Sequence, residues 1–318
     1  MGEPRLLLGG SMRDKVSVIG AGNVGATLAQ RLAELDLVDV ALVDVVEGLA
    51  EGKALDLLEA GPVVGYDTQV VGSTDYSITK DSRVVVITSG LARKPGMSRD
   101  DLASANAKIV GEVTTAVIKL SPGAILIIVT NPLDVMTELA LRVSGLPRTR
   151  VIGMAGVLDT ARFRTFLAAE LRVSVRSVEA YVLGGHGDFM VPLRGVTTVA
   201  GVPVGRLIPA DKLEEIVQRT RDGGAEIVRH LKTGSAFYAP SASTAQMVEA
   251  ILLDRGQILP CAMRLAGEYG LEGVVVGVPV KLGREGVTEV IEVELTSAER
   301  AELVSSAAAV RETIAVLG

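Results

Sequence analysis

Short runs of β-branched residues alternate with helical stretches through the first half of the chain, from Lys15 onward. Runs this short and apolar are typical of strands buried on both faces of a parallel sheet. Strands are expected at 16–19, 40–43, 69–71, 84–88 and 125–129, and helices at 24–35, 48–59, 99–119 and 133–143. This alternation predicts a doubly wound α/β domain, with helices on both faces of a parallel sheet. Turn residues cluster at 144–147, so we expect this domain to span 14–147.

The remaining residues, 148–318, show a mixed pattern that predicts an α+β domain. Helices are expected at 157–171, 211–232, 243–253 and 297–316, strands at 178–182, 274–282 and 287–294, and hairpin segments around 189–203. Residues 1–13 are interpreted as a loose N-terminal extension. A chain of 318 residues is long enough for these two domains.

Charge and composition exclude several classes of protein. Lysine and arginine number 32 against 38 acidic residues, a net charge of −6, so no general basic field exists to hold a nucleic acid or an anionic membrane. The longest apolar runs, such as 124–129 and 274–280, are too short to span a membrane. One cysteine, Cys261, cannot form a thiolate metal cage, and two histidines almost exclude a multi-histidine metal centre. We therefore expect a cytoplasmic protein without a metal.

A glycine-rich turn lies between the first expected strand and the first expected helix. Gly20-Ala21-Gly22-Asn23-Val24-Gly25 matches G-x-G-x-x-G in the context that a dinucleotide-binding (Rossmann) fold requires. The glycines allow a tight turn, approach of backbone amides to a pyrophosphate and close helix packing. Asp44 ends the second strand, where a carboxylate can accept both ribose hydroxyls and repel a 2′-phosphate, which favours NAD over NADP. The alternative is that the glycines only pack the helix and Asp44 closes a turn.

Two segments follow the carboxyl ends of expected strands, where open α/β sheets bind ligands. The loop 89–101 carries Arg93, Lys94 and Arg99, which are candidates for contacting an anionic substrate; the alternative is a solvated surface loop. Asn131, followed by Pro132, could hydrogen-bond beside a cofactor ring or cap the next helix.

The second domain contains an acidic, a basic and an imidazole side chain in unusual settings. Asp159 and Arg162 are spaced i, i+3 on an expected helix, so they project from one face, and their neighbours are apolar. His186 is framed by Gly184, Gly185 and Gly187, a setting unsuited to a packed core histidine. The other histidine, His230, has the surroundings of an ordinary helix-surface residue.

Together these stretches resemble the lactate and malate dehydrogenase family over nearly the whole chain from Lys15. The most specific motifs are 20–25, 93–102, 129–132, 158–162 and 184–188. By this resemblance, His186 accepts and donates the proton and Asp159 orients its imidazole. Arg162 would bind the substrate C1 carboxylate, Arg99 would polarise the carbonyl, and Asn131 would hydrogen-bond near the substrate hydroxyl. The implied NAD-binding residues are Gly20, Gly22, Asn23, Val24, Gly25, Asp44, Asn106, Val129 and Asn131.

The resemblance implies NAD-linked interconversion of malate and oxaloacetate. Family members acting on lactate typically carry glutamine where this chain has Arg93. Oxaloacetate brings a second carboxylate into a closed site, and without Arg93 that charge would be left unpaired. The alternatives are a lactate or other 2-hydroxy acid dehydrogenase, an NAD-dependent glycosidase, which the scarcity of cysteine and histidine disfavours, and a non-catalytic NAD-sensing protein. Relatives of this type are commonly tetramers or dimers, so we expect a homo-oligomer.

Overall fold

The computed structural model describes residues 13–91 and 99–315, within which one sheet of 11 strands and a second sheet of three are found. The first part of the large sheet has the strand order β3-β2-β1-β4-β5-β6, with every pair parallel. Its strands are β1 (Lys15–Ile19), β2 (Asp39–Val43), β3 (Val70–Ser73), β4 (Val84–Ile87), β5 (Ile125–Ile128) and β6 (Val151–Gly153). This is the doubly wound order in which dinucleotides bind where the order reverses, here beside β1.

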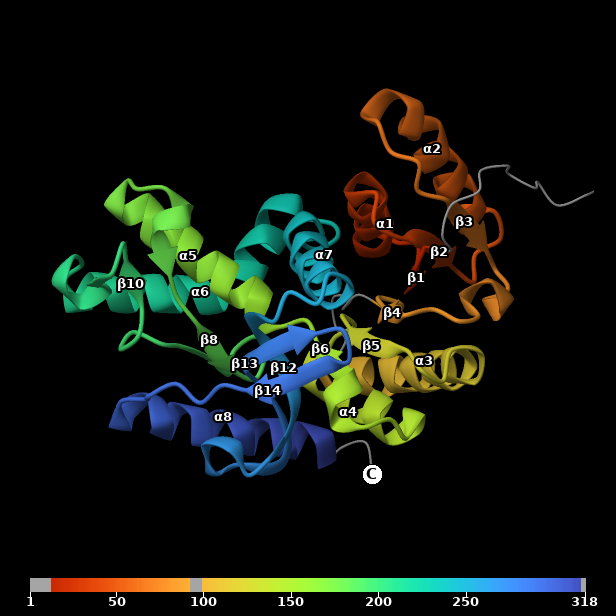
Figure 1. The fold of residues 1–318 in the computed structure, drawn as a ribbon. Helices are drawn as coiled ribbons and strands as arrows, with labels where there is room; N and C mark the ends of the chain where they lie inside the picture. Colours follow the sequence, from red (N-terminus) through yellow and green to blue (C-terminus); the bar gives the residue numbers. More distant parts are fainter. Residues whose placement is uncertain (1–12, 92–98, 316–318) are drawn as a thin grey trace, which may run out of the picture.

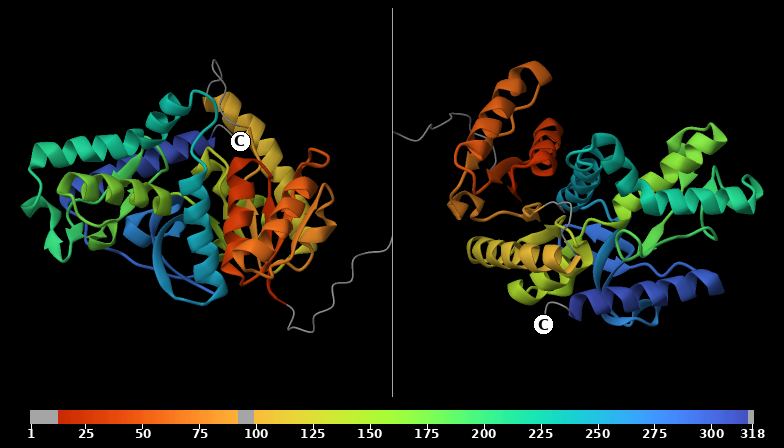
Figure 2. Two further views of the ribbon diagram at one scale, coloured as in Figure 1. Left: turned by 90° about the horizontal axis from the view of Figure 1, so that it is seen from above. Right: turned by 180° about the vertical axis from the view of Figure 1, so that it is seen from behind.

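Helices cover both faces of this parallel sheet, as predicted. They are α1 (Asn23–Leu35), α2 (Leu49–Val64), α3 (Arg99–Leu120) and α4 (Leu133–Ser144). Figures 1 and 2 show α1 and α2 on one face and α3 and α4 on the other. Strands β4 and β5 are buried at every position, and α1 buries Leu28, Leu32 and the small residues beside them at helical spacing. The alternation read from the sequence is therefore confirmed.

The same sheet continues without a break into the second half of the chain. Beyond β6 it contains β12 (Gln257–Ala266), β13 (Glu272–Gly283), β8 (Val182–Gly184) and β9 (Met190–Pro192), all antiparallel, and β14 (Gly286–Val290) pairs with β13. The small sheet consists of β7 (Val178–Glu179), β10 (Thr198–Val199) and β11 (Val202–Pro203). The helices are α5 (Gly156–Leu171), α6 (Ala210–Leu231), α7 (Tyr238–Leu252) and α8 (Ser297–Ala315).

Several expected elements differ from the structure. The single strand expected at 178–182 is two strands in different sheets, β7 and β8. Neither β6 nor β12 was expected: β6 is very short, and β12 has Pro260 in its interior, a residue that normally argues against a central strand. Helix α7 begins at Tyr238, before the expected residue 243, because Pro240 is tolerated in a first turn.

The domain limits 14–147 and 148–318 stay a prediction, although β6 lies after residue 147 and pairs with β5. The N-terminal extension lies outside the described residues apart from Arg13, whose Nη1 is 2.6 Å from Oδ1 of Asp36.

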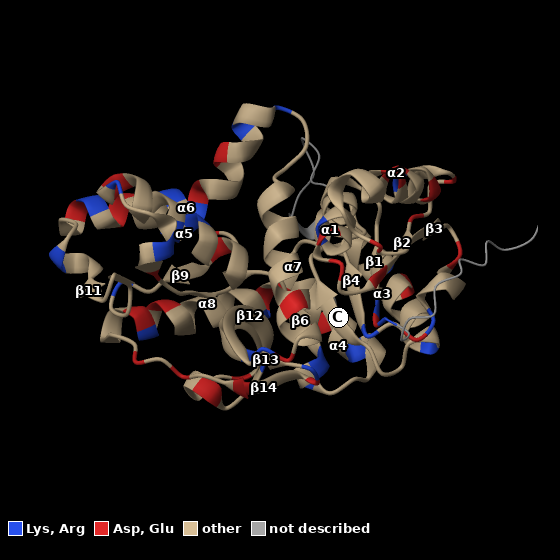
Figure 3. Ribbon diagram, turned by 45° about the horizontal axis from the view of Figure 1, so that its top comes forward, with Lys and Arg blue, Asp and Glu red and all other residues tan. Residues whose placement is uncertain are grey.

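Charges of both signs are interspersed along α6 (Figure 3). This helix buries Leu213, Ile216 and Val217 on one face, so its charged residues lie on the other. None of the helices in the described ranges combines the length and the apolar character needed to cross a membrane.

Candidate active site

The glycine-rich turn connects the carboxyl end of β1 to the first turn of α1, and each of its three glycines meets a different constraint. Gly20 has a φ of +106°, and a Cβ there would lie 2.7 Å from Oγ1 of Thr88. A Cβ at Gly25 would overlap the carbonyl oxygen of Gly20. At Gly22, by contrast, a Cβ would meet no protein atom within 4 Å. Protein packing therefore explains the first and third glycines, whereas the second fits a turn that a ligand approaches closely.

Asp44 follows β2 and contacts this turn directly. Its Oδ2 accepts a hydrogen bond from the Ala21 amide at 2.6 Å, and its Oδ1 accepts one from the Val46 amide at 3.0 Å. The contact with Val46 means that Asp44 does close a local turn, one of the two roles considered for it. Each carboxylate oxygen has a second lone pair, so the group can still accept ribose hydroxyls. Lys53, which sequence reasoning missed, donates to the Ala21 carbonyl at 2.6 Å and further fixes the turn.

The residues after β5 form the neighbouring part of the same edge. Val129 is 9% exposed and Asn131 is exposed; Asn131 does not cap α4, because Pro132 occupies the capping position and α4 has no side-chain cap. Asn106 on α3 is fully buried: its Oδ1 accepts from the Leu91 amide at 2.7 Å and its Nδ2 donates to the Asn131 carbonyl at 2.7 Å. Its side chain thus connects the segments after β4 and β5, and any effect on a cofactor would pass through these two backbones.

His186, Asp159 and Arg162 form one hydrogen-bonded group. Nδ1 of His186 lies 2.8 Å from Oδ2 of Asp159, and Nη1 of Arg162 lies 3.2 Å from Oδ1 of the same carboxylate. Asp159 is 2% exposed, whereas His186 and Arg162 keep 16% and 14% of their side-chain surface. The expected projection of Asp159 and Arg162 from one helix face is confirmed. Because an ionised Asp159 accepts the Nδ1 proton, Nε2 of a neutral His186 is the free proton acceptor.

The electrostatic surroundings of His186 favour its protonated form. Burial alone opposes charging the imidazole, but the charge and hydrogen bond of Asp159 outweigh it, so the pKa of His186 lies above its usual value of 6.5. Arg162 acts in the opposite direction and Asp134 in the same direction as Asp159. An imidazole in these surroundings is suited to accept and return a proton.

The structure adds Asp134, in the first turn of α4, to this group. Its Oδ2 accepts a hydrogen bond from the backbone amide of His186 at 2.9 Å, and its side chain is almost completely buried. Burial raises the pKa of Asp134 to about 6. Sequence reasoning missed this residue because an acidic side chain in a first helical turn is ordinarily favourable at the surface. The available signal was its position between the apolar residues Leu133 and Val135.

Part of the expected substrate loop lies outside the described residues. Arg93 and Lys94 lie outside the described residues, and Arg99 begins α3 with its side chain outside them. His230 is exposed on α6, as expected. Within the ranges described, no group of three or more histidine, cysteine or acidic residues is arranged to hold a metal ion.

The glycine-rich turn is suited to a dinucleotide, and the loop of His186 is suited to moving one proton. Both follow strands of the large sheet. Proton transfer beside a dinucleotide is what the oxidation of an alcohol requires. The fold and the site therefore define the class of nicotinamide-dependent dehydrogenases.

Comparison with known proteins gives the family. Two family profiles match: "lactate/malate dehydrogenase, NAD binding domain" over residues 14–153 and "lactate/malate dehydrogenase, alpha/beta C-terminal domain" over 156–316. The chain belongs to the lactate/malate dehydrogenase family.

Individual relatives match over nearly their full length. A malate dehydrogenase of Thermomicrobium roseum is 61% identical over 303 residues, which cover 95% of this chain and 98% of the relative. The malate dehydrogenase structure from Salinibacter ruber is 53% identical, with a TM-score of 0.91 over 95% of this chain and 97% of that one. A lactate dehydrogenase from Cryptosporidium parvum, complexed with lactic acid and nicotinamide adenine dinucleotide, is 40% identical, with a TM-score of 0.93 over 96% and 98% of the two chains.

Proposed function

We propose that this protein is an NAD-dependent malate dehydrogenase, which interconverts (S)-malate with NAD⁺ and oxaloacetate with NADH. The observation that carries the proposal is the pair of contacts made by Asp159. One of its carboxylate oxygens bonds Nδ1 of His186, and the other accepts a hydrogen bond from Arg162. The malate dehydrogenases that are 53 to 61% identical to this chain support the choice of substrate.

His186 performs the proton transfer. In malate oxidation its neutral Nε2 accepts the hydroxyl proton of the substrate, and Asp159 stabilises the imidazolium that forms. In oxaloacetate reduction the imidazolium returns this proton. NAD, when bound, supplies the hydride acceptor. Gly22 to Gly25, with Asn23 and Val24, would hold its pyrophosphate, and Asp44 its ribose; the open surroundings of the Gly22 Cβ position fit this role.

Arginine side chains bind the substrate in this proposal. Arg162 keeps 14% of its side-chain surface and donates to Asp159 through Nη1, so its guanidinium, which has five N–H donors, retains donors for the C1 carboxylate. Arg99 polarises the carbonyl. Arg93 binds the second carboxylate, which a monocarboxylate such as pyruvate lacks. Asn131 and Val129 complete the edge that faces the nicotinamide and the substrate, and Asn106 positions the Asn131 backbone from behind it.

The test follows NADH absorbance while the purified protein is offered oxaloacetate or pyruvate at equal concentration, with NADPH as a parallel cofactor. We expect fast consumption with oxaloacetate and NADH only, because Arg93 selects the dicarboxylate and Asp44 rejects a 2′-phosphate. A preference for pyruvate would favour the alternative of a lactate or other 2-hydroxy acid dehydrogenase. No turnover with either substrate would refute the proposal.

A homo-oligomer, either a dimer or a tetramer, and a cytoplasmic location are part of the proposal. Exposed apolar residues on α2, namely Leu55, Val63 and Val64, support association, since such side chains are favourable at subunit contacts. The burial of the single cysteine, Cys261, as a free thiol is compatible with a reducing compartment. Analytical ultracentrifugation will determine the oligomeric state.

A further inference from the structure

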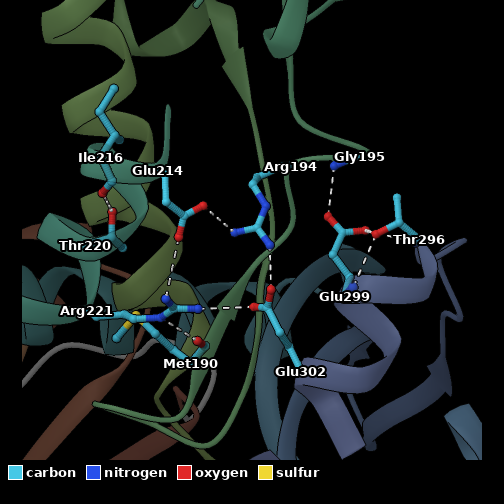
Figure 4. A network of polar contacts seen from close by, with 10 residues as sticks. All are labelled: Met190, Arg194, Gly195, Glu214, Ile216, Thr220, Arg221, Thr296, Glu299 and Glu302. Carbon is cyan, nitrogen blue, oxygen red and sulfur yellow. Dashed lines mark hydrogen bonds and ion pairs between the residues drawn. The ribbon is translucent and has the colours of Figure 1, made fainter. Parts of the chain in front are cut away.

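One face of α8 lies against the segment that carries His186. Glu299, Glu302, Ser306 and Val310 follow one another at the three- and four-residue spacing of a single helix face. Oε1 of Glu299 accepts the Gly195 amide at 2.9 Å (Figure 4).

Glu302 lies at the centre of the network in Figure 4 and connects three elements. Its two carboxylate oxygens accept from Arg194 at 2.5 Å and from Arg221 of α6 at 3.1 Å. Arg221 also donates to the Met190 carbonyl at 3.3 Å. This side of α8 therefore fixes the chain just beyond the histidine loop.

Ser306 is the member of this face that contacts the histidine loop itself. Its hydroxyl accepts a hydrogen bond from the Gly185 amide at 2.8 Å and donates one to the Phe189 carbonyl at 2.6 Å. These two backbone groups bracket His186, so a single hydroxyl connects both ends of the loop. Ser306 is 4% exposed, and loss of its hydroxyl would leave the buried Gly185 amide and the part-buried Phe189 carbonyl without this partner.

The loop depends on such contacts because its own sequence does not specify its shape. Gly184 and Gly187 have φ values of +83° and +93°, in a region that glycine enters freely among many others. The loop is also pressed against α8: a Cβ at Gly185 would lie 2.7 Å from Cγ2 of Val310. Its position must therefore come from tertiary hydrogen bonds.

We propose that Ser306 is a positioning residue for proton transfer, whose hydroxyl bridges Gly185 and Phe189 and so holds the His186 ring against Asp159. The role in turnover rests on the function proposed above; the role in holding the ring does not. The charged groups that act on the ring are Asp159 and Arg162 from α5 and Asp134 from α4. A loosened loop weakens mainly the contact with Asp159.

The test compares Ser306→Ala with Ser305→Ala, which removes the same hydroxyl from the exposed neighbouring position on α8. For Ser306→Ala we expect kcat for oxaloacetate reduction to fall about 10- to 100-fold while the Kd for NADH stays unchanged, because the loop is built from a different part of the chain than the glycine turn. Ser305→Ala should match the wild type in both. Ser306→Thr, which keeps a hydroxyl, should recover much of the lost rate.

A second measurement does not depend on activity. The chain contains only two histidines, so NMR titration with labelled histidine resolves His186 and uses exposed His230 as an internal reference. We expect Ser306→Ala to move the His186 titration to lower pH, since protonation of the ring is favoured by Asp159, and to leave His230 unchanged. A wild type that does not reduce oxaloacetate would refute the proposed function while leaving this readout intact.

Two results would overturn the role of Ser306. One is a His186 titration and a kcat in Ser306→Ala equal to those of Ser305→Ala. The other is a general loss of melting temperature and NADH binding in both Ser306→Ala and Ser306→Cys, which would assign the residue to folding alone. Ser306→Cys has nearly the size of serine but a weak donor and acceptor, so it tests the hydrogen bonds where the alanine variant does not fold.

Discussion

The dinucleotide turn and the histidine group are built in different ways. Gly20, Gly22 and Gly25 lie within six consecutive residues: Gly20 is required by its positive φ, Gly25 by its contact with the Gly20 carbonyl, and Gly22 leaves open space beside the turn. The histidine group, by contrast, combines the loop of His186 with residues of α4, α5 and α8. Gly185 in that loop and Ser306 on α8 lie 121 positions apart in the sequence. The first site is thus a property of a local turn, whereas the second exists only after distant parts of the chain have packed.

This difference predicts different sensitivities to substitution. A backbone site has few side chains to lose, so it should be damaged mainly by added atoms. A site of buried, mutually dependent charges should be damaged by removal of any one of them, because the remaining groups are then left unpaired.

The largest effect is expected for His186→Asn, which removes the group that we propose to move the substrate proton. We expect kcat to fall by about 10²- to 10⁴-fold, the usual contribution of a general acid or base, while NADH still binds to the glycine turn. Steady-state kinetics together with NADH fluorescence titration will measure both quantities. His230→Asn is the matched control on the exposed surface of α6 and should change neither; equal losses in the two variants would exclude the role of His186.

A smaller effect is expected for Arg93→Gln, which tests substrate choice. Removing one partner of a buried charge pair costs about 2 to 5 kcal/mol, so kcat/KM for oxaloacetate should fall by about 100-fold or more. Pyruvate has no second carboxylate, so its kcat/KM should fall far less. Arg176→Gln, at an exposed position, is the control. Equal losses for both substrates in Arg93→Gln would contradict its role in selecting the dicarboxylate.

The two sites also differ in how far the sequence predicts them. The glycine turn and Asp44 were predicted because a strand, three glycines, a helix and an acidic residue follow one another in the chain. In the structure the turn connects β1 to α1, and Asp44 follows β2. His186, Asp159 and Arg162 were identified individually by their unusual neighbours. The contacts of Asp134 and Ser306 with the histidine loop could not be predicted, since a serine in a helix and an acid in a first turn are common and only long-range packing brings them to that loop. Strand β12 was missed for a related reason, because its pairing with β13 outweighs the local effect of Pro260.

The glycine turn offers a pair of substitutions that separates binding from folding. Gly22→Ala adds a Cβ that meets no protein atom within 4 Å, so we expect unchanged stability and an NADH affinity reduced about 10-fold by contact with the ligand. Gly25→Ala places its Cβ on the Gly20 carbonyl oxygen and should cost about 1 to 3 kcal/mol of unfolding free energy. Denaturant unfolding and NADH titration measure the two effects. Loss of stability in Gly22→Ala without loss of affinity would mean that this glycine serves packing.

The smallest effect is expected for Asp134→Asn, and it appears in the pH profile of turnover. Oxaloacetate reduction needs protonated His186, so activity is present below the pKa of His186 and is lost as pH rises through it. Asp134, like Asp159, raises that pKa, whereas Arg162 lowers it. Removing the charge of Asp134 should therefore move the alkaline limb of kcat/KM to lower pH, by up to about one unit.

The same variant has an internal control in its dependence on pH. Burial places the pKa of Asp134 at about 6, so its carboxylate is charged mainly above that pH. Asp134→Asn should thus resemble the wild type more closely below pH 6 than above it, because the amide can still accept the hydrogen bond from the His186 amide and only the charge is lost. A uniform loss of activity at every pH would instead show that Asp134 contributes through the geometry of the loop. In that case its carboxylate would act in the same way as the hydroxyl of Ser306, by holding the histidine in place, and Asp159 would remain the main source of the raised pKa.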